Sequence, residues 1–123
     1  MAKSHSPKFL ALVEAARSAV SECDAAELKA MMSHENPPVV LDVRERHEFE
    51  AGHLVGSIHI GKGVLERDIE KHEIAEDTPV VLYCGGGYRS AIAAKSLQEM
   101  GYVNVYSLWG GWRGIQSEGL PIE

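Results

Sequence analysis

The chain of 123 residues has few cysteines, a shortage of positive charge and no long apolar run. Its two cysteines are too few for a disulfide framework, which favours a reducing compartment, and we expect a cytoplasmic protein. Its 12 lysines and arginines face 18 aspartates and glutamates. The net charge of −6 argues against nucleic acid or an anionic membrane as the main partner. No stretch approaches the roughly 18 apolar residues that a membrane-spanning helix needs.

The composition that is present is typical of one soluble globular domain. Hydrophobic residues make up 45% of the chain and charged residues 24%. The length suits a single domain with a real core and is too short for two domains. We expect residues 1–20 to form an N-terminal helical extension and residues 21–123 to form the domain itself. The oligomeric state stays open.

Helical and strand patterns alternate along the chain. Ser6 and Pro7 predict the N-cap and first residue of a leading helix, and the spacing of Asp24 and Glu27 predicts a capped second helix. The apolar face expected for the leading helix consists of Phe9, Leu12, Val13 and Ala16. Strands are expected within 17–23 and at 39–43, 57–60, 80–83 and 103–106, with further helices through Phe49, over 64–71 and over 91–100.

Strands that alternate with helices indicate an α/β fold. We expect a single domain whose mainly parallel sheet carries helices on both faces. In such sheets ligands bind at the carboxyl ends of the strands. Asp42 and Cys84 both fall at such ends, and this edge is therefore the expected site.

The most informative segment follows the strand pattern at 80–83 and consists of Cys84, Gly85, Gly86, Gly87, Tyr88, Arg89 and Ser90. Glycines lack a Cβ and adopt backbone angles closed to other residues, so their N–H groups can curl around the sulfur as a concave anion site. Arg89 adds a permanent positive charge and a planar donor fork suited to an oxyanion. These surroundings, at the start of a helix, favour a thiolate nucleophile. A buried cysteine in an ordinary strand-to-helix turn is the alternative, and it requires neither three glycines nor the arginine.

Four blocks of the sequence resemble the single-domain rhodaneses. They lie at 41–45, 52–60, 83–90 and 108–112, in the order and spacing of that family, and the resemblance covers about residues 21–122. It implies a rhodanese-like domain at 21–123 with a five-stranded, mostly parallel sheet. It also implies sulfurtransferase chemistry in which Cys84 carries sulfur and residues 85–90 cradle it.

Two positions depart from the family pattern. Gly85 stands where some members have a basic residue, so Arg89 is the only cationic side chain of the loop and the substrate preference stays open. Ile115 replaces a tryptophan that many members carry after the paired glycines, and we expect this change to affect packing rather than chemistry.

The resemblance implies a two-step transfer without metal or organic cofactor. Cys84 attacks the outer sulfur of a small sulfur-containing anion such as thiosulfate, sulfite leaves, and a persulfide remains on the protein. Amides of the loop stabilise the terminal sulfur, and Arg89 holds the oxyanion end of the donor. Cyanide, or a thiol such as glutathione or reduced thioredoxin, then accepts the sulfur.

Two other functions are left open. Cysteine-dependent phosphatases and arsenate reductases share the cysteine, the amide cradle and the arginine, but their loops generally place five residues between cysteine and arginine. Only residues 85–88 intervene here, which suits a single sulfur better than a phosphoryl group. The second alternative is a non-catalytic module that docks a peptide or delivers sulfur to a partner. Catalytic turnover would distinguish an enzyme from such a module.

Asp42 and Arg44 follow a buried strand pattern. Because a buried carboxylate requires hydrogen-bond partners or a paired cation, we expect Asp42 to brace the active-site loop rather than to transfer protons. His53 is expected to orient backbone, and the six histidines show no metal-site spacing.

Three further side chains have predicted places. We expect Cys23 to be a packed cysteine rather than a resolving thiol for the persulfide. Tyr88 is expected on the rim of the pocket. Trp109 and Trp112 flank paired glycines that suggest a tight turn close to neighbouring backbone, and they either wall the pocket or fill the core.

Overall fold

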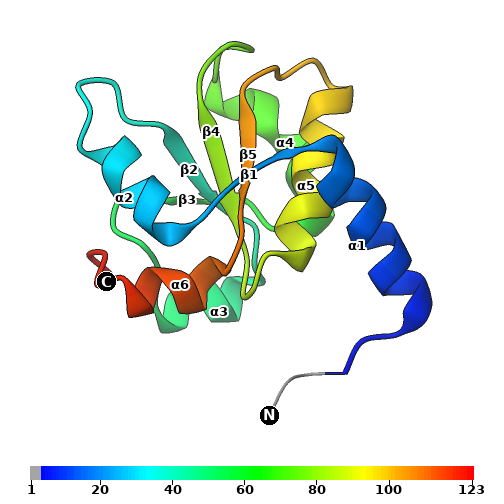
Figure 1. The fold of residues 1–123 in the computed structure, drawn as a ribbon. Helices are drawn as coiled ribbons and strands as arrows, with labels where there is room; N and C mark the ends of the chain where they lie inside the picture. The colour runs from blue at the N-terminus through cyan, green and yellow to red at the C-terminus, as the bar shows by residue number, and fades with distance from the viewer. Residues whose placement is uncertain (1–3) are drawn as a thin grey trace.

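The structure, a computed structural model, describes residues 4–123. One sheet contains β1 (Ser21–Cys23), β2 (Val39–Asp42), β3 (Ile58–His59), β4 (Val80–Tyr83) and β5 (Val105–Leu108), in the order β1-β5-β4-β2-β3. All neighbouring strands run parallel, so their carboxyl ends lie at one edge (Figure 1). The predicted α/β fold with a five-stranded parallel sheet is confirmed.

The helices are α1 (Pro7–Ala19), α2 (Ala25–Met32), α3 (Arg46–Ala51), α4 (Leu65–Asp68), α5 (Tyr88–Glu99) and α6 (Gly111–Ser117), with 3-10 turns η1 (Lys62–Val64) and η2 (Ile69–His72) on either side of α4. Two hydrophobic cores, one on each face of the sheet, hold the layers together. Residues of α4 and α5 contribute to one core, and residues of α2 and α6 contribute to the other.

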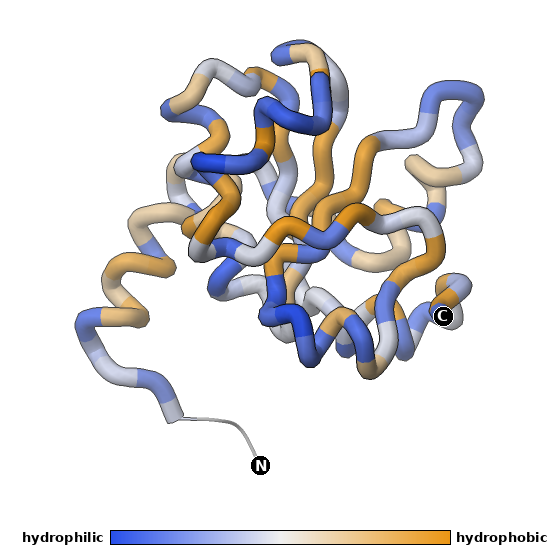
Figure 2. Tube along the Cα trace, turned by 180° about the vertical axis from the view of Figure 1, so that it is seen from behind, coloured by the Kyte–Doolittle hydropathy of each residue, from blue (hydrophilic) through white to orange (hydrophobic). Residues whose placement is uncertain are grey.

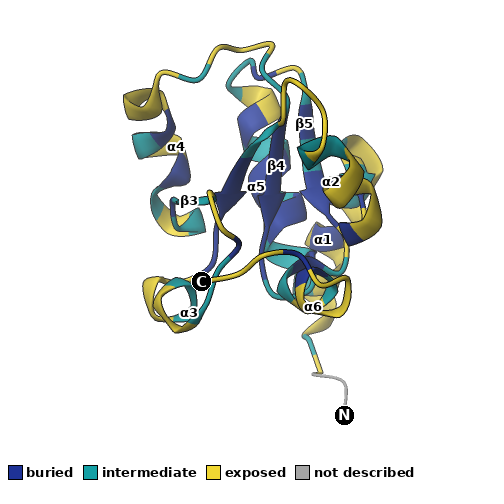
Figure 3. Cartoon of the chain, turned by 90° about the vertical axis from the view of Figure 1, so that its left-hand side faces the viewer, coloured by how far each residue is buried: buried dark blue, intermediate teal, exposed yellow. Residues whose placement is uncertain are grey.

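Strand β4 shows why the sheet is covered on both faces. Val80 and Leu82 point into the core beneath α4 and α5, whereas Val81 and Tyr83 point into the core beneath α2 and α6. Successive side chains of a strand alternate between faces, so a strand buried on both sides must be apolar throughout. The burial view accordingly shows β4 buried at the centre of the sheet, and the hydropathy view shows apolar segments in the middle of the molecule (Figures 2 and 3).

Helix α1 begins as predicted and packs along α5. The Ser6 side chain accepts a hydrogen bond from the N–H of Phe9 at 3.4 Å, and Pro7 is the first helical residue. The predicted apolar face is only partly right, because Val13 and Ala16 are buried whereas Leu12 is 56% exposed. No helix among residues 4–123 is long and apolar enough to cross a bilayer.

Several boundaries differ from the sequence-based expectations. Helix α1 continues through Arg17, so the edge strand is confined to Ser21–Cys23. Strand β5 starts two residues later than expected, because Val103 is exposed in a loop whereas polar Ser107 is fully buried in the strand. Helix α6 was not expected, since it is short and begins at Gly111, directly after the N-cap Gly110. The capping box of Asp24 and Glu27 is present as predicted.

Candidate functional site

Residues 84–90, which we call the cysteine loop, connect β4 to α5 and bring hydrogen-bond donors to the sulfur of Cys84. The Gly87 N–H lies 3.1 Å from Sγ and the Ser90 N–H lies 3.4 Å from it. The Ser90 hydroxyl lies 3.5 Å from Sγ and also contacts the Ser107 hydroxyl at 2.9 Å. Cys84 is 1% exposed. Two amide donors at a helix N-terminus therefore point at a buried sulfur, an arrangement that stabilises negative charge there.

The three glycines of the loop serve different purposes. Only Gly87 has a left-handed backbone, with φ of 112°, and a Cβ on it would lie 3.0 Å from the Trp109 ring. The missing Cβ of Gly85 instead leaves room for Arg89, whose Nη2 is 3.3 Å from the Cβ position. At Gly86 the nearest atom to the Cβ position is Nη2 of Arg113, a residue of helix α6, at 3.1 Å. The expectation of special backbone angles is therefore right for Gly87 and wrong for the other two.

The N-terminus of α6 fixes the carbonyl groups of the cysteine loop. The carbonyl of Cys84 accepts a hydrogen bond from the Trp112 N–H at 2.7 Å, and the carbonyl of Gly86 accepts one from the Gly110 N–H at 3.0 Å. In a trans peptide the C=O and N–H groups point in opposite directions. The bond to Gly86 therefore turns the N–H of Gly87 toward the sulfur.

Gly111 allows α6 to approach this closely. Its φ is 49°, and a Cβ on it would overlap the carbonyl oxygen of Cys84 and lie 2.8 Å from the carbonyl carbon and oxygen of Gly85. No side chain fits there without a shift of backbone. The paired glycines thus make the predicted close approach to neighbouring backbone, and the backbone they meet belongs to the cysteine loop.

Arg89 is held by a carboxylate that sequence reasoning missed. Its Nη1 and Nη2 donate to the two carboxylate oxygens of Glu48 at 2.9 and 3.3 Å. The hydrogen bond from Arg89 lowers the pKa of Glu48 to about 2. The pKa of Arg89 is raised, first by Glu48 and also by the neighbouring Cys84, against the effect of burial. Glu48 lies in α3, 41 residues before Arg89, and no local pattern connects the two.

The family of the chain follows from this loop and from comparison with known proteins. The sequence matches the rhodanese-like domain family over residues 24–118. The chain belongs to that family. The thiosulfate sulfurtransferase GlpE of Actinobacillus succinogenes is 37% identical over 93 residues, which cover 76% of this chain and 81% of GlpE.

Two further relatives have no established function. The uncharacterized protein YqhL of Bacillus subtilis is 42% identical over 74 residues, which cover 60% of this chain and 57% of YqhL. The chain thus matches little more than half the length of that relative. A solved structure from Rhodopseudomonas palustris CGA009, described as a protein of unknown function and possible tyrosine phosphatase, is similar with a TM-score of 0.82 at 30% identity, covering 100% of this chain and 99% of that one.

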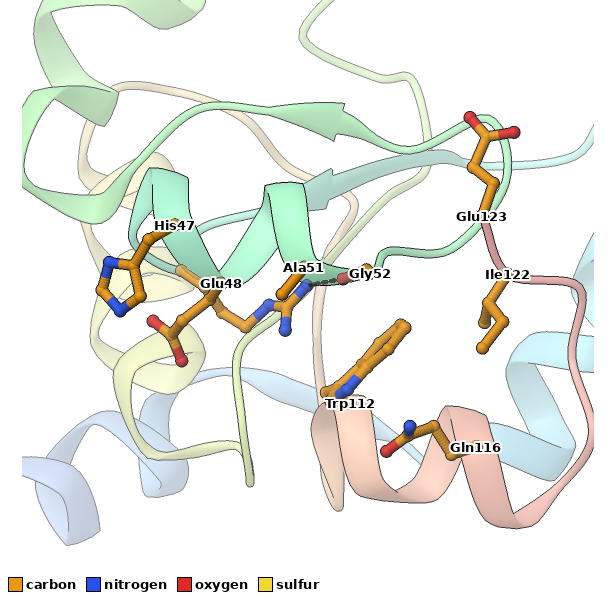
Figure 4. A pocket seen from close by; sticks show the side chains of 9 residues that line it. His47, Glu48, Ala51, Gly52, Trp112, Gln116, Ile122 and Glu123 are labelled. Atoms are coloured by element: carbon orange, nitrogen blue, oxygen red, sulfur yellow. Dashed lines mark hydrogen bonds between the residues drawn. The ribbon is translucent and has the colours of Figure 1, made fainter.

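In this rhodanese-like domain, Asp42 and Arg44 form a buried ion pair. Nε and Nη2 of Arg44 donate to the carboxylate of Asp42 at 2.7–3.1 Å. Nη2 also donates to the Gly52 carbonyl at 2.7 Å, the bond dashed in Figure 4. The hydrogen bonds of the Asp42 and Arg44 side chains reach the turn at Gly52 and not the cysteine loop, so Asp42 does not brace that loop by direct contact. The connection to the loop is indirect, because the Arg44 guanidinium lies 4.7 Å from the ring of Trp112, whose N–H binds the Cys84 carbonyl.

A hollow of about 630 Å³ opens beside this pair, between α3, α6 and the C-terminal residues (Figure 4). Its lining includes Arg44, His47, Glu48, Gly52, Trp112 and Gln116. Residues of the cysteine loop do not line it. Two lining residues connect it to the cysteine loop: Glu48, the partner of Arg89, and Trp112, whose N–H donates to the Cys84 carbonyl.

Aromatic side chains border the cysteine loop on the side of α1. Tyr88 stacks on Trp109 with ring centroids 5.9 Å apart and lies 6.3 Å from Phe9 and 5.0 Å from His5. Trp109 is 37% exposed, and the Arg17 guanidinium covers its ring at 3.6 Å. Trp109 therefore borders the loop, whereas Trp112 is half-buried against the core beneath α2 and α6 and lines the hollow.

The remaining predicted residues lie in structural roles. Cys23 is buried, as predicted for a packed cysteine, and burial raises its pKa to about 12. The two ring nitrogens of His53 contact the Phe49 carbonyl at 2.9 Å and the Glu123 carboxylate at 3.2 Å, so this side chain does orient backbone. No group of three or more His, Cys, Asp or Glu side chains that could hold a metal ion occurs among residues 4–123.

Proposed function

We propose that this rhodanese-like domain is a sulfurtransferase that carries sulfane sulfur as a persulfide on Cys84. The observation that carries the proposal is the pair of amides, from Gly87 and Ser90, that donate to Sγ at the N-terminus of α5. Donors placed in this way stabilise the Cys84 thiolate that begins the transfer. The relationship to a thiosulfate sulfurtransferase supports a donor of the thiosulfate type.

The proposed reaction balances without a cofactor. The thiolate of Cys84 attacks the outer sulfur of thiosulfate, a new S–S bond forms, and the electron pair of the old S–S bond leaves with sulfite. The persulfide keeps one negative charge on its terminal sulfur. An acceptor, such as cyanide or a small-molecule or protein thiol, then attacks that sulfur and restores the thiolate.

The cradle proposed for the sulfur consists of Gly85, Gly86, Gly87, Tyr88, Arg89 and Ser90. Within it Arg89 acts as one half of an ion pair, because Glu48 occupies both ends of its guanidinium. We assign to this pair the task of keeping a positive group near the sulfur in a fixed orientation. Asp42 and Arg44 support the site from a distance through Trp112.

Phosphate-ester hydrolysis is the second candidate, because the similar structure from Rhodopseudomonas palustris is described as a possible tyrosine phosphatase. A phosphoryl group needs donors for three oxygens, whereas the short loop here directs two amides at one buried sulfur. The geometry therefore favours sulfur transfer. A non-catalytic docking role would keep the fold and lose turnover.

Parallel assays separate these functions. The wild-type protein should form thiocyanate from thiosulfate and cyanide, and Cys84→Ser should not. Neither protein should hydrolyse p-nitrophenyl phosphate. Hydrolysis of this phosphate ester by the wild type but not by Cys84→Ser would indicate a phosphatase instead of a sulfurtransferase. Persulfide that forms but is not discharged to cyanide or thiols would indicate a docking or carrier module.

A further inference from the structure

A second guanidinium lies at the cysteine loop, and it comes from α6. The N–H of Arg113 approaches the Gly85 carbonyl at 3.4 Å. The Arg113 side chain folds against Gly86, with Nη2 3.1 Å and Cζ 3.8 Å from the position a Cβ would take. Gly86 directly precedes Gly87, whose N–H is 3.1 Å from the sulfur. The absence of a side chain at position 86 thus gives this guanidinium a place at the border of the cradle.

Arg113 also carries the charge that an approaching anion meets. The charge of Arg89 is already balanced by Glu48 at 2.9 Å. Arg113 is exposed, and it takes part in no ion pair among residues 4–123. The chain as a whole has a net charge of −6, which disfavours anions elsewhere on its surface. A single unpaired guanidinium at the loop therefore has a large influence on which reagents reach the sulfur.

A cation at this border would assist the proposed reaction. When the outer sulfur of a donor contacts Sγ, the anionic end of the donor lies outside the cradle. An S–S bond of about 2 Å separates that end from the outer sulfur, and its oxygens lie farther out. A planar guanidinium presents several N–H donors to such an oxyanion. We propose that Arg113 attracts and orients the anionic end of the sulfur donor at Cys84. This inference rests on the proposed sulfur transfer, and it makes an anionic donor the preferred substrate class.

The test compares two alkylating reagents of similar size that differ in charge, iodoacetate and iodoacetamide. Each forms an S–C bond with the Cys84 thiolate and releases iodide, so neither depends on sulfur transfer. We expect Arg113→Gln to lower the ratio of the iodoacetate rate to the iodoacetamide rate about three- to tenfold, the range of a charged contact at a partly exposed site. Arg113→Lys keeps the charge and should restore most of the ratio.

Arg67→Gln is the matched control, because it removes an exposed guanidinium of α4, 71% accessible, from outside the loop. It should leave the ratio unchanged. The KM for thiosulfate should rise in Arg113→Gln by a similar factor, with little change in kcat. The inference would be overturned if Arg113→Gln left the ratio of the iodoacetate rate to the iodoacetamide rate unchanged. It would also be overturned if neither reagent modified Cys84 of the wild-type protein. If Arg113→Gln lowers the ratio of alkylation rates but the wild-type protein never loads sulfur from thiosulfate, the proposed function is overturned and anion recognition by Arg113 stands.

Discussion

Replacement of Gly111 by alanine tests whether the close approach of α6 builds the cysteine loop. The new Cβ would overlap the Cys84 carbonyl oxygen and lie 2.8 Å from the Gly85 carbonyl group. These are backbone atoms, so relief requires a shift of the loop or of the helix. Shifts of this kind in packed regions cost about 1–3 kcal/mol. The left-handed φ of 49° adds about 1–2 kcal/mol for any residue with a Cβ.

Gly119→Ala separates these two contributions. Gly119 also has a left-handed backbone, with φ of 72°, but a Cβ there would have no neighbour within 4 Å. Both substitutions change the entropy of the unfolded chain equally. The difference between the two variants therefore isolates the overlap with the cysteine loop, and we expect Gly111→Ala to be less stable by about 1–3 kcal/mol.

Urea unfolding at equilibrium measures this difference, and sulfur loading from thiosulfate measures its consequence for the site. The reasoning predicts that Gly111→Ala loads sulfur more slowly even where it is fully folded, because the displaced Cys84 carbonyl changes the loop. Gly119→Ala should load at the wild-type rate. Equal unfolding free energies and equal loading rates for the two variants would refute the account of α6.

The remaining predictions concern the charged groups and the second cysteine. Asp42→Asn leaves the buried Arg44 guanidinium without its counter-charge and should cost about 3–5 kcal/mol in urea unfolding; a loss below about 1 kcal/mol would contradict a buried ion pair. The pKa of Glu48 lies at about 2 instead of its ordinary 4.5, so the stability from its pairing with Arg89 is complete above pH 4.5 and lost as the pH falls toward 2. Glu48→Gln should therefore reduce the pH dependence of the unfolding free energy between these two pH values, and an unchanged pH dependence would argue against the ion pair. Because burial raises the pKa of Cys23 to about 12, only roughly one molecule in ten thousand is a thiolate at pH 8. Peptide mapping after brief iodoacetamide treatment of the folded protein should find Cys23 unmodified, and rapid modification would show that it is accessible.

The sequence predicted the elements whose local chemistry is strong. The apolar run at 80–83 predicted strand β4, and the spacing of Asp24 and Glu27 predicted a capped helix. Gly87 and Arg89 could be predicted because they follow Cys84 by three and five positions in the sequence. In each case the residues that interact lie within a few positions of one another, so that a local pattern suffices.

The parts that were missed depend on contacts between distant segments. Ser107 is polar yet fully buried in β5, because its hydroxyl contacts Ser90, and a hydropathy pattern cannot anticipate that partner. Glu48 reaches Arg89 only after α3 and α5 are brought to the same edge of the sheet. Helix α6 has a weak helical signal, since glycine occupies both its N-cap and its first position. Its role becomes clear only from the contact of Gly111 with the Cys84 carbonyl.

Intact-protein mass spectrometry tests the central claim most directly. The wild-type protein is incubated with thiosulfate, measured, mixed with cyanide and measured again, with Cys84→Ser treated in parallel. The account predicts that the wild type gains the mass of one sulfur and loses it to cyanide as thiocyanate appears, while the serine variant changes at neither step. A wild type that gains no sulfur, or a serine variant that gains as much as the wild type, would contradict persulfide transfer at Cys84.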